Sequence, residues 1–152
     1  MVSDRPIAIA SDHGGLDLKN QVVRLLQDDL GLKVDDMGAF SDESVDYPDY
    51  GMLVARAVST GQADRGILIC GTGIGMSIIA NKFAGVRAAL CHNADTARLS
   101  REHNDANILV LGGRVLSGEL AREMVRIWFN TPFEGGRHKR RIDKIRELEE
   151  HC

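Results

Sequence analysis

The residues that could carry out chemistry gather in short stretches, and the most informative of these is CGTGIG at Cys70–Gly75. The apolar run Gly66–Cys70 predicts a buried strand, so a thiol stands at a strand end where glycines let the backbone turn closely around a ligand. A helix beginning after this turn offers unpaired N–H groups and the positive end of its dipole, which stabilise a thiolate and a developing oxyanion. We therefore predict that Cys70 is a proton-transferring base.

The same stretch has other interpretations. A cysteine at a strand end is often no more than a small buried apolar residue, and only the adjacent glycines favour a functional role here. A dinucleotide-binding fingerprint fits poorly, because the third glycine of GxGxxG falls at Met76 and the loop follows the third predicted strand. A thiol-redox role fits poorly too, since Cys91 and Cys152 are far from Cys70 in sequence. We expect no dinucleotide cofactor.

Two more polar stretches follow or precede predicted elements. Ser11–Gly15 follows the first predicted strand and contains Asp12 and His13, which could act at the site or simply cap a helix and sit on the surface. Asp46–Tyr50 could bind a ligand or mark a turn before a helix, with Asp46 or Asp49 as the cap. Either interpretation is open for both stretches.

Two later stretches add a histidine and a group of arginines. His103 precedes a strand start, where active sites are less expected, so a structural role is favoured unless a second subunit brings it to a site. The basic run Arg137–Arg141 is either a solvated face or a phosphate clasp, because arginines four residues apart share one side of a helix. The histidines and cysteines show neither HExxH nor short-spaced ligand pairs, so we expect no metal site.

Strands and helices alternate around these stretches. The predicted strands are Ile7–Ala10, Lys33–Met37, Gly66–Cys70, Val86–Cys91 and Ile108–Leu111. The predicted helices are 18–30, Met52–Val58, one from the glycine turn to about Phe83, Asp95–His103, and one whose apolar face is Leu120, Met124, Ile127 and Trp128. Continuous apolar strands between helices predict an α/β fold, a Rossmann-like α/β/α sandwich with a five-stranded, mainly parallel sheet. Its ligand site should lie at the carboxyl ends of the strands.

The chain changes character after Pro132. Ile142, Ile145 and Leu148 form a narrow apolar stripe on a charged C-terminal helix. We predict that this helix docks on a partner subunit, although packing on its own domain fits the same pattern.

Bulk properties limit the classes of function. The 152 residues fit one domain, 1–152, and the net charge of −3 argues against nucleic acid as the main partner. The N-terminal stretch lacks the apolar core of a signal peptide and no run is long enough to span a bilayer, so we expect a cytoplasmic protein without a membrane partner. The cysteines are three in number and widely spaced, which indicates free thiols.

Taken together, these stretches make the chain resemble the ribose-5-phosphate isomerase B family, which also includes the subunits of galactose-6-phosphate isomerase. The resemblance covers nearly the whole length. It rests on five motifs in order: SDHGG at Ser11–Gly15, DYPDY at Asp46–Tyr50, GILICGTGIGMSIIANKFAGVRA at Gly66–Ala88, SREHNDAN at Ser100–Asn107 and EGGRHKRR at Glu134–Arg141.

The resemblance implies a homodimer or dimer of dimers whose shared active sites interconvert ribose 5-phosphate and ribulose 5-phosphate through a cis-enediolate. By this resemblance Cys70 moves a proton between C2 and C1, and His103 opens the sugar ring, assisted by Asp12 or Thr72. The implied enediolate-binding residues are Gly71, Thr72, Gly73, Ile74 and Gly75; the hydroxyl-binding residues are Asp46 and Asn104; and the phosphate-binding residues are His13, Arg114, Arg137 and Arg141. Such chemistry needs one base, oxyanion donors and a phosphate clamp, and neither a metal nor a cofactor.

Two alternatives stay open. The same chemistry could serve galactose 6-phosphate, allose 6-phosphate or a tetrose 4-phosphate, because the motifs do not separate these substrates. A non-catalytic sugar-phosphate-binding subunit would have lost its base or histidine, whereas Cys70, Thr72 and His103 are all present.

Overall fold

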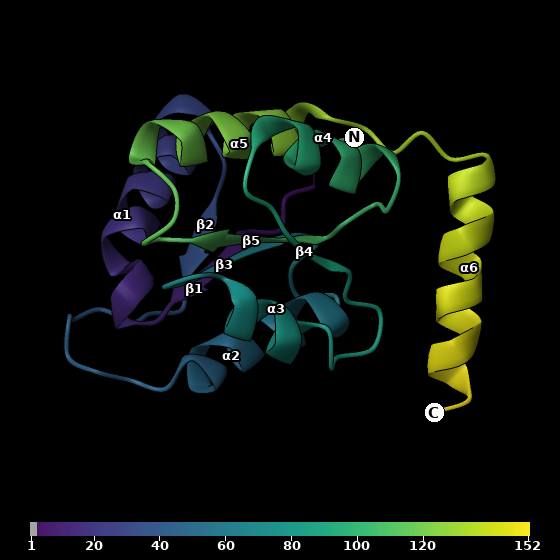
Figure 1. The fold of residues 1–152 in the computed structure, drawn as a ribbon, viewed down its shortest axis with the longest axis horizontal. Coiled ribbons are helices and arrows are strands. Elements are labelled where there is room, and N and C mark those ends of the chain that lie inside the picture. The colour runs from purple at the N-terminus through teal and green to yellow at the C-terminus, as the bar shows by residue number, and fades with distance from the viewer. Residues whose placement is uncertain (1–2) are drawn as a thin grey trace.

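The computed structural model describes residues 3–152 and contains one five-stranded sheet in the order β2-β1-β3-β5-β4 (Figure 1). Every neighbouring pair of strands is parallel. The strands are β1 (Ile7–Ser11), β2 (Val34–Asp36), β3 (Gly66–Cys70), β4 (Ala88–Leu90) and β5 (Ile108–Gly112). The predicted parallel α/β sheet is therefore confirmed.

The three central strands are buried along their whole length, because helices cover both faces of the sheet. One face carries α1 (Leu16–Arg24), α4 (Ala94–Glu102) and α5 (Gly118–Asn130), and the other carries α2 (Tyr47–Ser59) and α3 (Ile74–Ala80) (Figure 1). A single turn at His13–Gly15 precedes α1, and a wider helical turn at Leu25–Asp29 follows it. Each face has its own apolar core, and Trp128 is fully buried in the first.

The strand register brings three loops to one edge. Ser11 pairs with Ile69, and Cys70 pairs with Gly112, so β1, β3 and β5 end together. The loops that follow these strands, after Ser11, Cys70 and Gly112, therefore meet at the carboxyl edge of the sheet, as parallel topology requires.

Several helix boundaries differ from the predicted ones, and two of the differences have a clear local cause. α2 begins at Tyr47 rather than Met52, because Pro48 stands in the first turn, where its missing N–H breaks no hydrogen bond. α3 ends at Ala80 rather than near Phe83, since the Asn81 amide turns to the backbone of Ala88 in β4, accepting at 2.9 Å and donating at 3.0 Å. Both differences come from local hydrogen-bonding chemistry that apolar periodicity does not register.

The C-terminal helix α6 (Arg137–Glu150) stands beyond the β4 edge of the sheet (Figure 1). Ile142 is buried against the domain, but Ile145 and Leu148 are 49% and 66% exposed. An open groove of about 750 Å³ lies between the apolar side of α6 and residues near β4, including Phe83 and Ala89. The helix thus contacts its own domain at both ends, through Ile142 and through Glu149, which accepts from the N–H of Gly85 at 3.1 Å, while Ile145 and Leu148 between them stay exposed. Over residues 3–152, no helix combines the length and apolar character needed to cross a bilayer.

Candidate active site

The turn after β3 holds Cys70 beneath a backbone donor. The thiol is 4% exposed, and the N–H of Gly73 donates to Cys70 Sγ at 3.2 Å. Gly73 has a φ of +84°, and a Cβ there would meet the carbonyl of Leu111 at 3.2 Å, so glycine is required at this position. Thr72 is exposed and its Oγ1 accepts from the N–H of Ile74 at 3.2 Å. The turn therefore places a backbone donor directly on the sulfur atom.

The turn after β1 lies beside the Cys70 turn. The N–H of Asp12 donates to the carbonyl of Ile69 at 3.2 Å, which joins the two loops. Asp12 is buried and its Oδ1 accepts from the N–H of Gly15 at 3.0 Å, so its carboxylate does cap the following turn. His13 Nδ1 accepts from the N–H of Val45 at 3.1 Å, and the other ring nitrogen, Nε2, is then the donor of the neutral ring.

Arg114 brings a positive charge to the same edge from the loop after β5. Its N–H donates to the carbonyl of Gly71 at 2.9 Å. Its guanidinium fills the space between two loops, since a Cβ on Gly14 or on Gly71 would lie 3.3 Å from it. Within residues 3–152, Arg114 makes no ion pair with a carboxylate. A guanidinium without a protein counter-ion is suited to bind an anion.

Asp46 stands at the start of α2, near the glycine turn. The ring of Tyr47 packs so closely on Gly75 that a Cβ on Gly75 would lie 2.5 Å from Tyr47 Cζ. Asp46 is exposed and occupies the N-cap position of α2, but within residues 3–152 its side chain makes no capping hydrogen bond. Its carboxylate is free to contact a ligand.

The other predicted site residues lie at the opposite edge of the sheet. His103 and Asn104 follow α4, and the next residues lead to the amino end of β5, where Asn107 accepts from the N–H of Gly66 at 2.9 Å. Arg137 and Arg141 lie on the first turns of α6 and are exposed. A five-residue strand spans roughly 13–17 Å, so one chain does not bring this group to Cys70.

Two arginines hold the turn that carries Asn104. The Arg87 side chain donates to the carbonyl of Asn104 at 2.9 Å and to that of Asp105 at 2.9 Å. Burial lowers the pKa of Arg87, and the nearby Asp105 carboxylate opposes that effect. Arg101 donates to Asp105 Oδ1 at 2.8 Å and to the carbonyl of Ala106 at 2.7 Å. These bonds keep Asp105 at a φ of +45°, a left-handed conformation that is costly for a residue other than glycine.

Several residues without a predicted role make close contacts near the site or in the core. His138 is buried and stacks on His103, and Glu134 faces it. The signal available in the sequence was the four-residue spacing of Glu134 and His138. Lys19 is fully buried and donates to Asp36 at 2.7 Å and to the carbonyl of Ala39 at 2.6 Å. Its position on the apolar face of α1 was the corresponding signal.

Comparison with known proteins defines the class. A family model described as Ribose/Galactose Isomerase matches residues 7–145. Ribose-5-phosphate isomerase B of Escherichia coli (strain K12) is 48% identical over 146 residues, which are 96% of this chain and 97% of the relative. D-erythrulose-4-phosphate isomerase of Pectobacterium atrosepticum is 44% identical over 140 residues, 91% of each chain.

A solved structure agrees with these relatives. Ribose-5-phosphate isomerase B of Clostridium thermocellum superposes with a TM-score of 0.93 at 53% identity, covering 96% of this chain and 98% of that one. The fold and sequence are thus those of an enzyme class that isomerises sugar phosphates. The chain belongs to the ribose/galactose isomerase family.

Proposed function

We propose that this protein interconverts ribose 5-phosphate and ribulose 5-phosphate. The observation that carries the proposal is the Cys70 thiol, which accepts from the Gly73 N–H and lies in the turn that the Arg114 guanidinium contacts, in a chain 48% identical to a ribose-5-phosphate isomerase B. A base next to an anion-binding group is what proton transfer on a phosphorylated sugar needs. Because its cysteines are unpaired, the enzyme is proposed to act in the reducing cytoplasm.

The proposed reaction is a proton transfer between two neighbouring carbons. His103 opens the furanose ring, with Asp12 or Thr72 assisting. The Cys70 thiolate then removes the proton from C2, and a hydroxyl proton passes from O2 to O1 of the resulting cis-enediolate. Cys70, whose thiol proton can exchange with solvent, returns a proton to C1 to give the ketose. Backbone donors of the turn formed by Gly71, Thr72, Gly73, Ile74 and Gly75 would hold the enediolate oxygen.

The remaining residues would bind the ends of the sugar. Asp46 and Asn104 are proposed to bind hydroxyl groups. His13 and Arg114 would hold the phosphate from the carboxyl edge of one chain, and Arg137 and Arg141 from a second chain. Phosphate binding far from the reacting carbons fixes their position against the base, which raises the rate through orientation.

The proposed assembly is a homodimer, or a dimer of dimers, with each active site shared by two chains. Its support is the position of His103 at the edge of the sheet opposite Cys70. The exposed Ile145 and Leu148 on α6 would be covered by the second copy, since apolar side chains in a row at a groove are typical of an interface.

A tetrose phosphate is the second candidate substrate, because one relative is named D-erythrulose-4-phosphate isomerase. The same base, Cys70, the same enediolate-binding turn at Gly71–Gly75 and the same phosphate-binding residues would serve this shorter sugar. The family description also includes galactose isomerases, so six-carbon phosphates belong in the same test.

The deciding experiment measures kcat/KM on ribose 5-phosphate, erythrose 4-phosphate, galactose 6-phosphate and allose 6-phosphate, with EDTA and without added cofactor. A preference for ribose 5-phosphate supports the proposal. A preference for another sugar keeps the mechanism and changes the substrate. Absence of turnover on all four would contradict an isomerase and favour a subunit that only binds sugar phosphates.

A further inference from the structure

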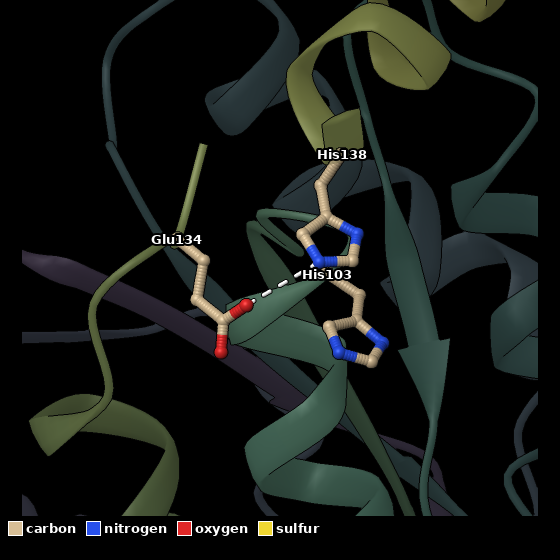
Figure 2. A group of neighbouring side chains, drawn as sticks. All are labelled: His103, Glu134 and His138. Atoms are coloured by element: carbon tan, nitrogen blue, oxygen red, sulfur yellow. Dashed lines mark ion pairs between the residues drawn. The ribbon is translucent and has the colours of Figure 1, made fainter. Parts of the chain in front are cut away.

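Two histidines from distant parts of the chain form a stacked pair. The rings of His103 and His138 lie 4.2 Å apart between centroids and are inclined by 14° (Figure 2). His103 ends α4, and His138 lies in the first turn of α6. The contact therefore links the end of α4 to the start of α6.

A carboxylate faces this pair. Glu134 Oε2 lies 3.3 Å from His138 Nε2, and Figure 2 shows one nitrogen of each ring turned toward Glu134. His138 is 4% exposed, and its Nε2 has no aligned hydrogen bond among residues 3–152. The backbone N–H of Glu134 donates to the carbonyl of Glu102 at 3.1 Å, which fixes the carboxylate beside the end of α4. A buried imidazole is thus held in place by a ring on one side and a negative charge on another.

The same three residues have ligand atoms within 4.8 Å of one another. A metal ion lies about 2.0–2.1 Å from a histidine nitrogen, in the direction of its in-plane lone pair. Because the two rings are nearly parallel and stacked, their in-plane lone pairs lie in separate planes and do not converge on one ion. The geometry therefore favours a fixed pair of rings over a metal site.

We propose that His138, anchored by Glu134, is a positioning residue for His103 in opening the sugar ring; this inference rests on the proposed function. The side-chain torsion that sets the plane of a histidine ring is broad, so a histidine at a helix end needs a neighbour to fix it. Stacking on a buried ring supplies that constraint. The Glu134 carboxylate also stabilises the positive charge that arises when the pair takes up a proton.

Ring opening can be separated from the base step by choice of substrate. Ribose 5-phosphate closes a furanose ring through O4, and this ring must open before isomerisation. Ribulose 5-phosphate cannot close the corresponding ring, because its O5 carries the phosphate. Exchange of its C1 hydrogen with solvent deuterium therefore reports on Cys70 and the enediolate alone.

The test compares these two rates at saturating substrate in the full-length protein. His138→Ala should lower the turnover of ribose 5-phosphate about tenfold or more, because a small misplacement of a reacting group is costly. Deuterium exchange into ribulose 5-phosphate should stay within about twofold of the unsubstituted protein, because that step does not involve ring opening. His138→Phe keeps an aromatic platform and should recover part of the loss, and Glu134→Gln should give a smaller loss.

Matched controls come from the far end of α6. His151→Ala and Glu150→Gln change the same residue types at exposed positions and should leave both rates unchanged. If His138→Ala does not fold, His138→Phe and Glu134→Gln carry the same comparison.

Each other outcome is decisive. Equal losses of turnover and exchange would overturn the inference, because His138 would then act only through folding or assembly. Unchanged turnover of ribose 5-phosphate would overturn it as well. Absence of exchange in the unsubstituted protein would instead contradict the proposed function, before any variant is considered.

Discussion

The two groups of predicted site residues are built in different ways. Around Cys70, backbone hydrogen bonds between three strand-end loops set the geometry, including Asp12 to Ile69 and Arg114 to Gly71. Around His103, side chains set it, namely a stacked ring and arginines that hold the turn after α4. The first group follows from parallel topology, whereas the second depends on contacts between helix ends. We call the first group the Cys70 half of the proposed site and the second group the His103 half. In a site shared between chains, each chain would contribute one half.

The prediction with the largest expected effect tests whether the Cys70 half and the His103 half of one active site come from different chains. Cys70→Ala removes the proposed base and His103→Asn the proposed ring-opening group, and each should lower kcat about 10²- to 10⁴-fold. Mixing the two variants under conditions that exchange subunits should restore about a quarter of the original activity. Half of the randomly formed dimers are mixed, and in each of these one of two shared sites is intact.

The control for this mixture keeps both substitutions in one chain. A Cys70→Ala, His103→Asn double variant mixed with the unsubstituted protein should produce no intact site in the mixed dimers. Activity in the mixture of single variants that stays at the level of the separate proteins, despite measured subunit exchange, would mean that each chain holds a whole site. Cys70→Ala should keep its folding and its binding of sugar phosphate.

A pair of adjacent glycines tests how rigid the Cys70 half is. A Cβ on Gly15 would meet the carbonyl oxygen of Ile69 at 2.7 Å, and backbone cannot move aside easily. Gly15→Ala should cost about 2 kcal/mol of unfolding free energy. At Gly14 the nearest atoms belong to the flexible Arg114 side chain at 3.3 Å. Gly14→Ala should therefore change stability little and raise KM instead.

Denaturant unfolding and steady-state kinetics on both glycine variants check this contrast. If Gly14→Ala and Gly15→Ala lost equal stability, the contact with the Ile69 carbonyl would not be what makes Gly15 necessary. An unchanged KM in Gly14→Ala would argue that Arg114 does not contact the substrate.

The Cys70 half was largely predictable from the sequence, whereas the His103 half was not. The apolar runs predicted all five strands, and parallel order then predicted that the loops after Ser11 and Cys70 meet. Sequence also identified His103 as a residue at the wrong edge for a single-chain site. It did not find His138 as a stacking partner, because that contact depends on how the linker after α5 turns α6 back toward α4.

Local chemistry limited the remaining predictions. The start of α2 at Tyr47 depends on a proline in the first helical turn, and the end of α3 depends on the Asn81 side chain. Lys19 lies on an apolar helix face, yet it is buried because Asp36 and a backbone carbonyl receive its charge. Periodicity locates an element, but a single polar side chain decides where it stops or what it can bury.

The prediction with the next largest effect concerns KM and compares the proposed phosphate-binding arginines, Arg114 in the Cys70 half and Arg141 in the His103 half. Arg114→Ala and Arg141→Ala should each raise KM for ribose 5-phosphate about tenfold, because a charge-assisted hydrogen bond contributes about 1.5–3 kcal/mol. Both effects should shrink at high salt, because Arg114 and Arg141 are both exposed. Steady-state kinetics at two ionic strengths measure this, with exposed Arg146→Ala as a control on the same helix. If KM changed in only one of these two variants, only that arginine would bind the phosphate.

The smallest expected effect concerns the thiols outside the proposed site. Burial raises the pKa of the Cys91 thiol, so at any given pH less of it is thiolate than in an exposed cysteine. Its alkylation by iodoacetamide should become appreciable only above the ordinary thiol range near about pH 8.5. Cys152 is exposed and should be alkylated faster, because the reagent can reach it. Mass spectrometry of each cysteine alongside residual activity measures this. Labelling of Cys152 should leave turnover intact, and ribose 5-phosphate should protect only Cys70. If activity were lost in step with labelling of Cys91 or Cys152, Cys70 would not be the only thiol that turnover requires.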